Sequence, residues 1–279
     1  MKLYECILSL FGGIAMFITA MNMMSTNIQK LAGPKIKILF AKLNNNLICA
    51  GIGTIVAMIM QNAAAPSVMS ISFVNADMIN MPQAIAVMIG ANFGSTIIGI
   101  LASLDGLNLN VYFSFVSFIG IVFTFFKKEN LKIIGGIICG LGMIFIGLNL
   151  MKQSCNYDSF KNLLRNALEK IDFPLALVLI GFVVTALIQS AAAMTGLIVV
   201  MVQGGSMNLK SSLFMILGAN IGTSTTALIS TIGKGISAKR TGIAHLFFTI
   251  FGMMIKIILI FILMIMNYIR NQIKNLQNQ

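Results

Sequence analysis

Residues 61–98 read QNAAAPSVMSISFVNADMINMPQAIAVMIGANFGSTII, and residues 189–226 read QSAAAMTGLIVVMVQGGSMNLKSSLFMILGANIGTSTT. The two segments align without a gap at an offset of 128 residues. Each begins with Gln-x-Ala-Ala-Ala and reaches Gly-Ala-Asn-x-Gly 29 residues later. Chance similarity between apolar segments would not keep both motifs at this spacing, so the chain contains an internal repeat.

The composition predicts that these repeats lie in a membrane. Of 279 residues, 58% are hydrophobic and 9% are charged, whereas about 25% of the residues in a soluble domain are charged. Apolar stretches over 6–24, 173–202 and 241–266 exceed the ~18 residues that indicate a spanning helix. We therefore predict an all-α, multi-pass protein of the cytoplasmic membrane, in contact with lipid.

Charge and motifs argue against several other classes of protein. The net charge is +12, but the basic residues are spread over short connecting segments, so no nucleic-acid partner is predicted. The cysteines have neither CxxC spacing nor histidine partners, which argues against a metal or disulfide framework. No HExxH, GxSxG, P-loop or paired carboxylates are found, so neither an enzyme nor an ATP-driven pump is expected.

The repeat also predicts the order of helices. Residues 13–24 resemble residues 140–151, so each repeat is expected to begin with a spanning helix. Residues 46–75 and 173–203 are too long for one span, and each half is too short, which predicts two re-entrant hairpins broken at the glutamine motifs. The other expected elements are spans over 6–28, 82–104, 110–126, 132–151, 208–232 and 240–268, connectors over 29–45 and 152–172, and Gly-Ala-Asn turns within 82–104 and 208–232.

Crossing parity predicts how the repeats are oriented. Each repeat crosses the bilayer an odd number of times, so the second enters from the opposite side and the repeats are inverted. The expected units are a first repeat over 1–128, a second over 129–268 and a short polar tail over 269–279. The distribution of lysine and arginine favours connector 29–45 on the cytoplasmic side and both termini outside. Inverted repeats are common in secondary transporters, whose site lies near the midplane at the repeat interface.

The glutamine motifs are the first candidate for a binding site. A helix broken inside the membrane leaves backbone N–H and C=O groups that need partners. Half-helices beginning after Gln61 and Gln189 offer N–H groups to an anion, and carbonyls together with the glutamine side chains suit a small cation. The alternative is a packing turn that glutamine caps.

The Gly-Ala-Asn motifs add hydroxyl and amide groups. Glycine that serves helix packing, and hydroxyls that bond to the helix backbone, are the alternatives to a binding role. Runs of hydroxyls beside an asparagine, in both repeats, better suit the lining of a hydrated cavity. The candidates are Asn92, Ser95, Thr96, Asn220, Thr223, Ser224, Thr225 and Thr226.

Two further residues in the last span could have a role. Lys256 lies far from either end of that span, and a charge inside the membrane indicates function unless it snorkels or contacts another helix. His245 has no Asp, Ser or Cys partner nearby in sequence, which favours a structural role over a proton relay.

These motifs resemble the type II sodium/phosphate cotransporter family. That family has two inverted repeats, each with a hairpin bearing Gln-Ser-Ser-Ser and a following Gly-Ala-Asn-x-Gly-Thr. Here residues 61–64 (QNAA) and 189–192 (QSAA) correspond to the first motif, and residues 218–223 (GANIGT) fit the second. Residues 239–245 (KRTGIAH) resemble the basic, Ala-His segment that leads the family's last helix. The resemblance covers nearly the whole chain.

The resemblance implies sodium-coupled transport of inorganic phosphate, with sodium as the coupling ion and no other cofactor. Of the six family serines in the two hairpins, Ser190 alone retains a hydroxyl here, and Ser67 and Thr195 could compensate in part. Loss of these hydroxyls keeps two alternatives open: transport of another small solute, or a non-transporting membrane protein. The oligomeric state is left open. The expected ion-binding residues are Gln61, Asn62, Ser67, Asn92, Ser95, Thr96, Gln189, Ser190, Thr195, Asn220, Thr223, Ser224 and Thr225, with sodium at Gln61, Gln189, Asn92 and Asn220.

Overall fold

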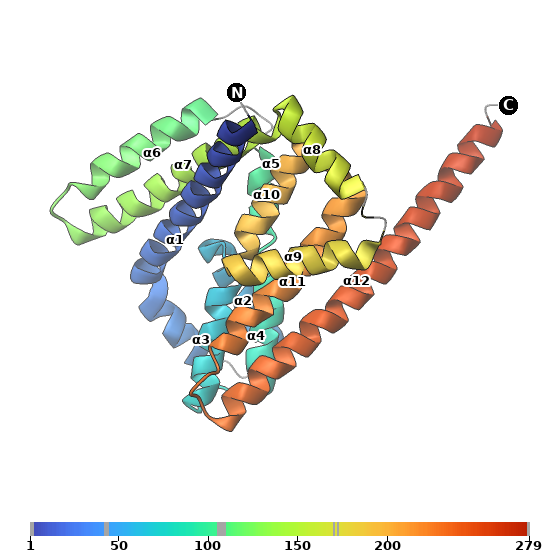
Figure 1. Cartoon of the computed structure of the whole chain (residues 1–279). Helices are drawn as coiled ribbons and strands as arrows, with labels where there is room; N and C mark the ends of the chain where they lie inside the picture. The colour runs from blue at the N-terminus through green and yellow to red at the C-terminus, as the bar shows by residue number, and fades with distance from the viewer. Residues whose placement is uncertain (1–2, 42–44, 105–109, 170, 172, 278–279) are drawn as a thin grey trace.

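The computed structural model describes residues 3–41, 45–104, 110–169, 171 and 173–277, with side chains described for 3–31, 45–103, 111–168, 171 and 173–259. In these parts of the chain every regular element is a helix (Figure 1). The helices are α1 (Leu3–Ala41), α2 (Asn46–Met60), α3 (Ala64–Asn75), α4 (Met81–Gly94), α5 (Ile97–Leu104), α6 (Asn110–Thr124), α7 (Glu129–Cys155), α8 (Asp158–Glu169), α9 (Pro174–Ile188), α10 (Ala191–Gln203), α11 (Leu209–Ile229) and α12 (Ile236–Gln277).

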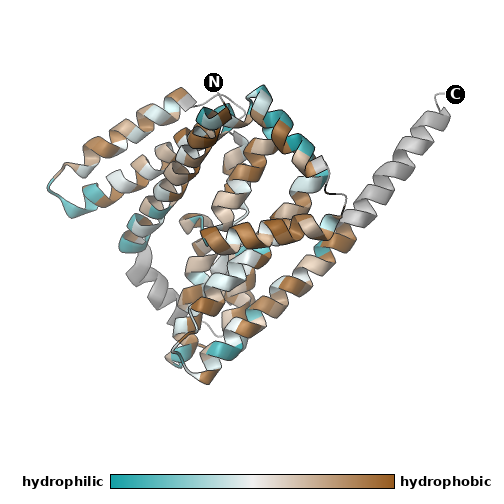
Figure 2. Cartoon of the chain, viewed as in Figure 1, coloured by the Kyte–Doolittle hydropathy of each residue, from teal (hydrophilic) through white to brown (hydrophobic). Residues whose placement is uncertain are grey.

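Length and hydropathy identify this helical chain as a membrane protein. Five stretches are long and apolar enough to cross a bilayer: Leu3–Leu31, Met81–Ser103, Glu129–Cys155, Leu209–Ile229 and Ile236–Leu259. Hydrophobic residues run along the lengths of α9, α11 and α12, whereas hydrophilic residues gather on α8 and at the turns between helices (Figure 2). The predicted all-α membrane class is confirmed.

Both glutamine motifs end a helix in the same conformation. Gln61 follows α2 with φ 49° and ψ 32°, and Gln189 follows α9 with φ 57° and ψ 26°. These left-handed values are uncommon for any residue other than glycine, so each break is locally defined. A new helix starts two or three residues later in each case, α3 at Ala64 and α10 at Ala191.

The helices that follow are capped in the same way in both halves of the chain. Asn80 precedes α4, and its side chain accepts a hydrogen bond from the Gln83 N–H at 2.9 Å. Asn208, which lies 128 positions later, precedes α11 and accepts from the Ser211 N–H at 2.7 Å. An asparagine cap satisfies an N–H group that the first turn of a helix leaves unpaired.

Glycines hold the neighbouring helices together at the same offset. A Cβ on Gly90 of α4 would overlap the Ala50 carbonyl oxygen of α2, and a Cβ on Gly53 would overlap the Val87 carbonyl oxygen. Small residues thus let the two backbones touch, as is common between membrane helices. The same reciprocal contacts join α9 and α11 through Gly218 to Val178 and Gly181 to Met215.

These contacts correct the expectation of turns at the Gly-Ala-Asn motifs. Residues 90–92 lie in the last turns of α4, and residues 218–220 lie within α11. The glycines are there because the helix that carries them packs closely on its neighbour, and such packing needs no chain reversal. The first motif is nevertheless followed by a break, at Ser95 and Thr96 between α4 and α5, so the expected span over 82–104 consists of two helices.

Three other boundaries differ from expectation. Helix α1 continues through most of the connector expected over 29–45, and α12 continues through the expected tail as far as Gln277. The connector expected over 152–172 contains α8. Within α8, Phe160, Leu164 and Leu168 recur every four residues and pack on the core. Polar residues between them are compatible with a helix that is apolar on one face, which is why polarity alone suggested a loop.

The equivalent first helices of the two halves, α1 and α7, pack on each other in the centre of the molecule. Phe17 of α1 and Phe145, Leu148 and Met151 of α7 are almost fully buried in the main core. Helix α6 packs against α7 on one side, and α12 runs along the other side past α11, α3 and α4 (Figure 1). Between these outer helices, the ends of the short helices α3 and α10 face a common interior.

Candidate functional site

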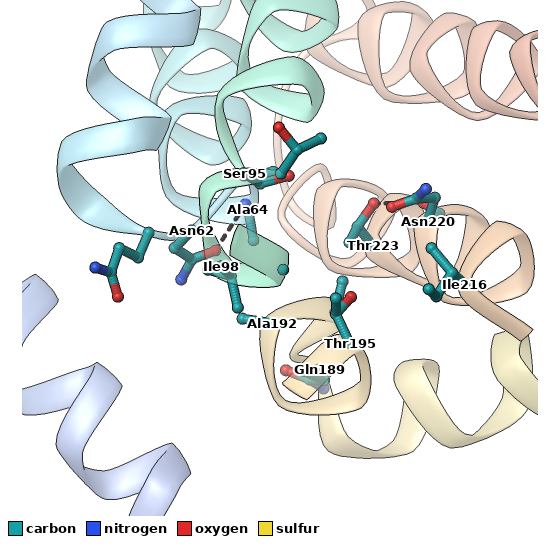
Figure 3. Close-up of a pocket in the computed structure, with 15 residues that line it drawn as sticks. Asn62, Ala64, Ser95, Ile98, Gln189, Ala192, Thr195, Ile216, Asn220 and Thr223 are labelled. Carbon is teal, nitrogen blue, oxygen red and sulfur yellow. Dashed lines mark hydrogen bonds between the residues drawn. The ribbon is translucent and has the colours of Figure 1, made fainter. Parts of the chain in front are cut away.

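A cavity of about 220 Å³ lies where the short helices begin. It is far larger than the ~10–15 Å³ that one water needs. Residues from the first half of the chain, among them Asn62 and Ser95, line it opposite Gln189 and Thr195 of the second half (Figure 3). Its lining consists of Gln61, Asn62, Ala63, Ala64, Ser95, Thr96, Ile98, Gly99, Gln189, Ala191, Ala192, Thr195, Ile216, Asn220 and Thr223. We call it the central cavity.

The first turns of two helices open onto this cavity. Ala64 is the first residue of α3, and Ala191 and Ala192 are the first two of α10. The N–H groups at the start of a helix have no carbonyl one turn earlier to bond, and the helix dipole makes this end positive. Two such ends at one cavity form a setting for an anion.

Asn62 combines a structural and a chemical role. Its side-chain oxygen accepts a hydrogen bond from the Ala64 N–H at 2.8 Å and so caps α3. A primary amide also carries two N–H donors, and the cap uses neither of them. Asn62 therefore presents donors to the central cavity that it lines. In the second half, Ser190 has the capping role, accepting from the Ala193 N–H at 3.2 Å.

The hydroxyl groups at the cavity offer the opposite chemistry. Ser95 donates to the Asn92 carbonyl at 2.9 Å, Thr96 to the Phe93 carbonyl at 2.8 Å, and Thr223 to the Asn220 carbonyl at 2.6 Å. Because each proton is already bonded to the backbone, what remains is an oxygen with free lone pairs. Such oxygens are ligands for a small cation, so the cavity offers donors for an anion and acceptors for a cation.

Most of the expected binding residues line the central cavity, and the rest do not. Ser67 is buried and donates to the Ala63 carbonyl at 2.8 Å, and Ser190 is used as the cap of α10. Ser224 and Thr225 donate to the carbonyls of Ile221 and Gly222. Their hydroxyls are thus bonded locally within the helices. Asn92 lines a neighbouring groove together with His245 and Lys256.

The apolar part of the lining was not identified from sequence. Ile98 and Gly99 lie three and four residues after Ser95, and Ile216 lies four residues before Asn220. These spacings place each residue on the same helical face as a polar residue of the site. Helical periodicity applied to Ser95 and Asn220 would have found them, whereas a search for polar groups does not.

Broken helices, a polar cavity between them and an otherwise apolar exterior define a multi-pass membrane transporter. Residues 16–153 and 154–278 both match the family described as Na+/Pi-cotransporter, and the chain belongs to this family. The assignment made from the sequence motifs is confirmed. It is a family of transporters, not of enzymes.

The curated relatives differ in how much they share with this chain. Protein YqeW of Bacillus subtilis, which is uncharacterized, is 27% identical over 241 residues, 86% of this chain and 78% of YqeW. YjbB of Escherichia coli K12, a candidate inorganic phosphate export protein, is 22% identical over 254 residues, 89% of this chain and 46% of YjbB. Sodium-dependent phosphate transport protein 2A of Rattus norvegicus is 35% identical over 92 residues, 33% of this chain and 14% of that protein.

The chain therefore spans less than half the length of YjbB and a small part of protein 2A. No solved structure matches it.

Proposed function

We propose that this chain is a sodium-coupled transporter of inorganic phosphate in the cytoplasmic membrane, with its binding site in the central cavity. The observation that carries the proposal is the convergence of two helix N-termini and the Asn62 amide on a cavity that also presents hydroxyl oxygens. Membership of the Na+/Pi-cotransporter family supports phosphate as the substrate. The printed names of YjbB and protein 2A point to phosphate as well, one through export and one through sodium dependence.

Backbone groups answer the difficulty that the alanines raise. The family's hairpin serines are largely alanine here, so their hydroxyl donors are missing. Hydrogen bonds to a charged group contribute about 1.5–3 kcal/mol each. The free N–H groups of Ala191 and Ala192, together with the amides of Asn62 and Gln189, supply donors of the same kind at the same wall of the cavity.

Sodium would use the acceptor side of the same cavity. The hydroxyl oxygens of Ser95, Thr96 and Thr223 carry lone pairs that no described hydrogen bond uses. Gln61 and Gln189 add side-chain oxygens at the C-terminal ends of α2 and α9, where carbonyls also point away from the helix. Asn220 lines the cavity, and Asn92 lies beside it. An anion and a cation in one cavity would stabilise each other, which is the physical basis for coupling.

The proposal includes two inverted repeats, residues 1–128 and 129–268, each with a re-entrant hairpin: α2 and α3 in the first, α9 and α10 in the second. Contacts at the ends of the hairpins support it. The Asn75 side chain, at the end of α3, accepts from the Gly235 N–H before α12 at 2.8 Å. Gln203, at the end of α10 and 128 positions after Asn75, donates to the Ser103 carbonyl of α5 at 3.3 Å. Each hairpin thus meets the other repeat.

Cysteine labelling tests this topology. Met78 follows α3 and Leu209 begins α11, and both are exposed; the four native cysteines are buried. With Met78→Cys and Leu209→Cys in separate proteins, a membrane-impermeant thiol reagent added to intact cells should label Leu209→Cys alone. Both termini would lie on the labelled side. Equal labelling of the two variants would rule out the inverted arrangement.

Transport of another small anion on this scaffold is the second candidate, and the alanines at residues 63–65 and 191–193 favour it. Uptake into liposomes containing the purified protein separates the two. Labelled phosphate should accumulate with an inward sodium gradient and not with an equal potassium gradient. Sodium-dependent uptake of sulfate but not of phosphate would favour the second candidate, and no dependence on sodium would refute the first.

A further inference from the structure

A groove of about 350 Å³ lies between α4, α11 and α12, next to the central cavity. The residues that α12 contributes recur every three or four positions, so they form one face of that helix over three turns. Thr96 and Asn220 line both the groove and the central cavity. The groove is lined by Ile89, Asn92, Phe93, Thr96, Leu217, Asn220, His245, Phe248, Thr249, Gly252, Met253 and Lys256.

His245 is buried at this groove without a partner. The residue is only 2% exposed. Its backbone carbonyl accepts from the Thr249 hydroxyl at 2.8 Å, but its ring has no hydrogen bond to any described residue. Buried polar groups are nearly always paired, so a histidine ring of this kind indicates a missing partner.

Lys256 brings a positive charge to the same groove. It lies 20 residues after Ile236, the first residue of α12, which is about 30 Å along the axis at ~1.5 Å per residue. Its exposure within a spanning stretch is exposure to lipid, where an ammonium group is not hydrated and is costly to hold. The groove lining contains no Asp or Glu. A counter-charge must therefore come from a bound ligand.

We propose that this groove is a second oxyanion site, held by Lys256 and His245 with the Asn92 amide, and that phosphate moves between it and the central cavity past Thr96 and Asn220. The choice of phosphate rests on the function proposed above. The groove itself asks only for a phosphate-type oxyanion, which could be free phosphate or the headgroup of an anionic lipid. A ligand here would pair the charge of Lys256 and the ring of His245 at once.

Equilibrium dialysis of the full chain in a maltoside micelle, which contains no phosphate, tests the proposal with labelled inorganic phosphate. The wild-type protein should bind two phosphates per chain. Lys256→Gln should weaken one of them about tenfold or more, because it removes a charged donor, and His245→Phe should weaken the same one. Lys239→Gln is the matched control: it removes the same charge at the start of the same helix, but residue 239 does not line the groove.

The outcomes separate the two proposals. One phosphate per chain, unaffected by Lys256→Gln, would overturn the groove site and leave the central site standing. One phosphate that Lys256→Gln removes would support the groove and overturn the central site.

If no phosphate binds, native mass spectrometry after exchange into phosphatidylglycerol vesicles decides the lipid source. Retained phosphatidylglycerol that is lost in Lys256→Gln but kept in Lys239→Gln would support the groove as a lipid-phosphate site. Retention that does not differ between the variants would overturn the proposal.

Discussion

Replacing Asn62 by aspartate separates its capping role from its proposed role in binding. The side-chain oxygen of Asn62 accepts from the Ala64 N–H at 2.8 Å. An aspartate keeps this acceptor and is about as good a cap as asparagine. Its negative charge at the start of α3 also suits the helix dipole. The substitution therefore removes only the amide donors, and it adds a negative charge to the wall of the central cavity.

The size of the cavity gives the size of the effect. With a volume of about 220 Å³, an ion at its centre lies roughly 4–5 Å from the wall. Two like unit charges at that distance repel by about 3–4 kcal/mol at an effective dielectric constant of 20. Phosphate affinity should fall by two to three orders of magnitude, at about 1.4 kcal/mol for each factor of ten. The midpoint of thermal unfolding should stay close to that of the wild type.

Sodium-driven uptake of labelled phosphate and thermal unfolding, measured on the same preparations, provide the assay. Asn80→Asp is the matched control, because Asn80 caps α4 in the same way but is exposed and lies outside the cavity. It should leave uptake unchanged. If Asn62→Asp transports phosphate as well as Asn80→Asp does, the Asn62 amide does not contact the anion and serves only as a cap.

Other substitutions test the packing and the polar groups. Gly90→Ala and Gly218→Ala each place a Cβ onto a backbone carbonyl and should cost about 1–3 kcal/mol or more; Gly252→Ala, with open space around it, should not change the unfolding midpoint. Thr226→Val should raise the midpoint, because the buried Thr226 hydroxyl has no partner and such a group costs about 1–3 kcal/mol; a lower midpoint would indicate that a ligand or water pairs with it. Asn75→Ala should cost about 0.5–1.5 kcal/mol by leaving the Gly235 N–H unpaired; an unchanged midpoint in urea or heat would mean that this link between the halves is dispensable.

Local sequence signals predicted the helix breaks well. A glutamine followed by three alanines, in two places 128 residues apart, marked the ends of α2 and α9 to within a residue. The Gly-Ala-Asn motif was harder to interpret, because glycine serves both turns and close helix contacts. Only the position of a neighbouring backbone, such as the Ala50 carbonyl beside Gly90, distinguishes the two.

The site was predicted in outline and not in detail. The motifs identified Asn62, Gln189 and Thr223, but sequence gives no hydrogen-bond partner for a hydroxyl. Ser67 and Ser224 were therefore expected at the site, although each donates to a carbonyl of its own helix. The groove beside α12 depends on how three helices that are distant in sequence pack together, and no local pattern encodes that arrangement.

The most direct test of the account is the reciprocity of phosphate and sodium binding to the purified protein. If both ions occupy the central cavity, sodium must lower the dissociation constant for phosphate, and phosphate must lower that for sodium by the same factor. Isothermal titration of each ion, with and without the other and with potassium as the control cation, measures both factors. The account predicts equal factors well above one. Phosphate affinity that is the same in sodium as in potassium would contradict it.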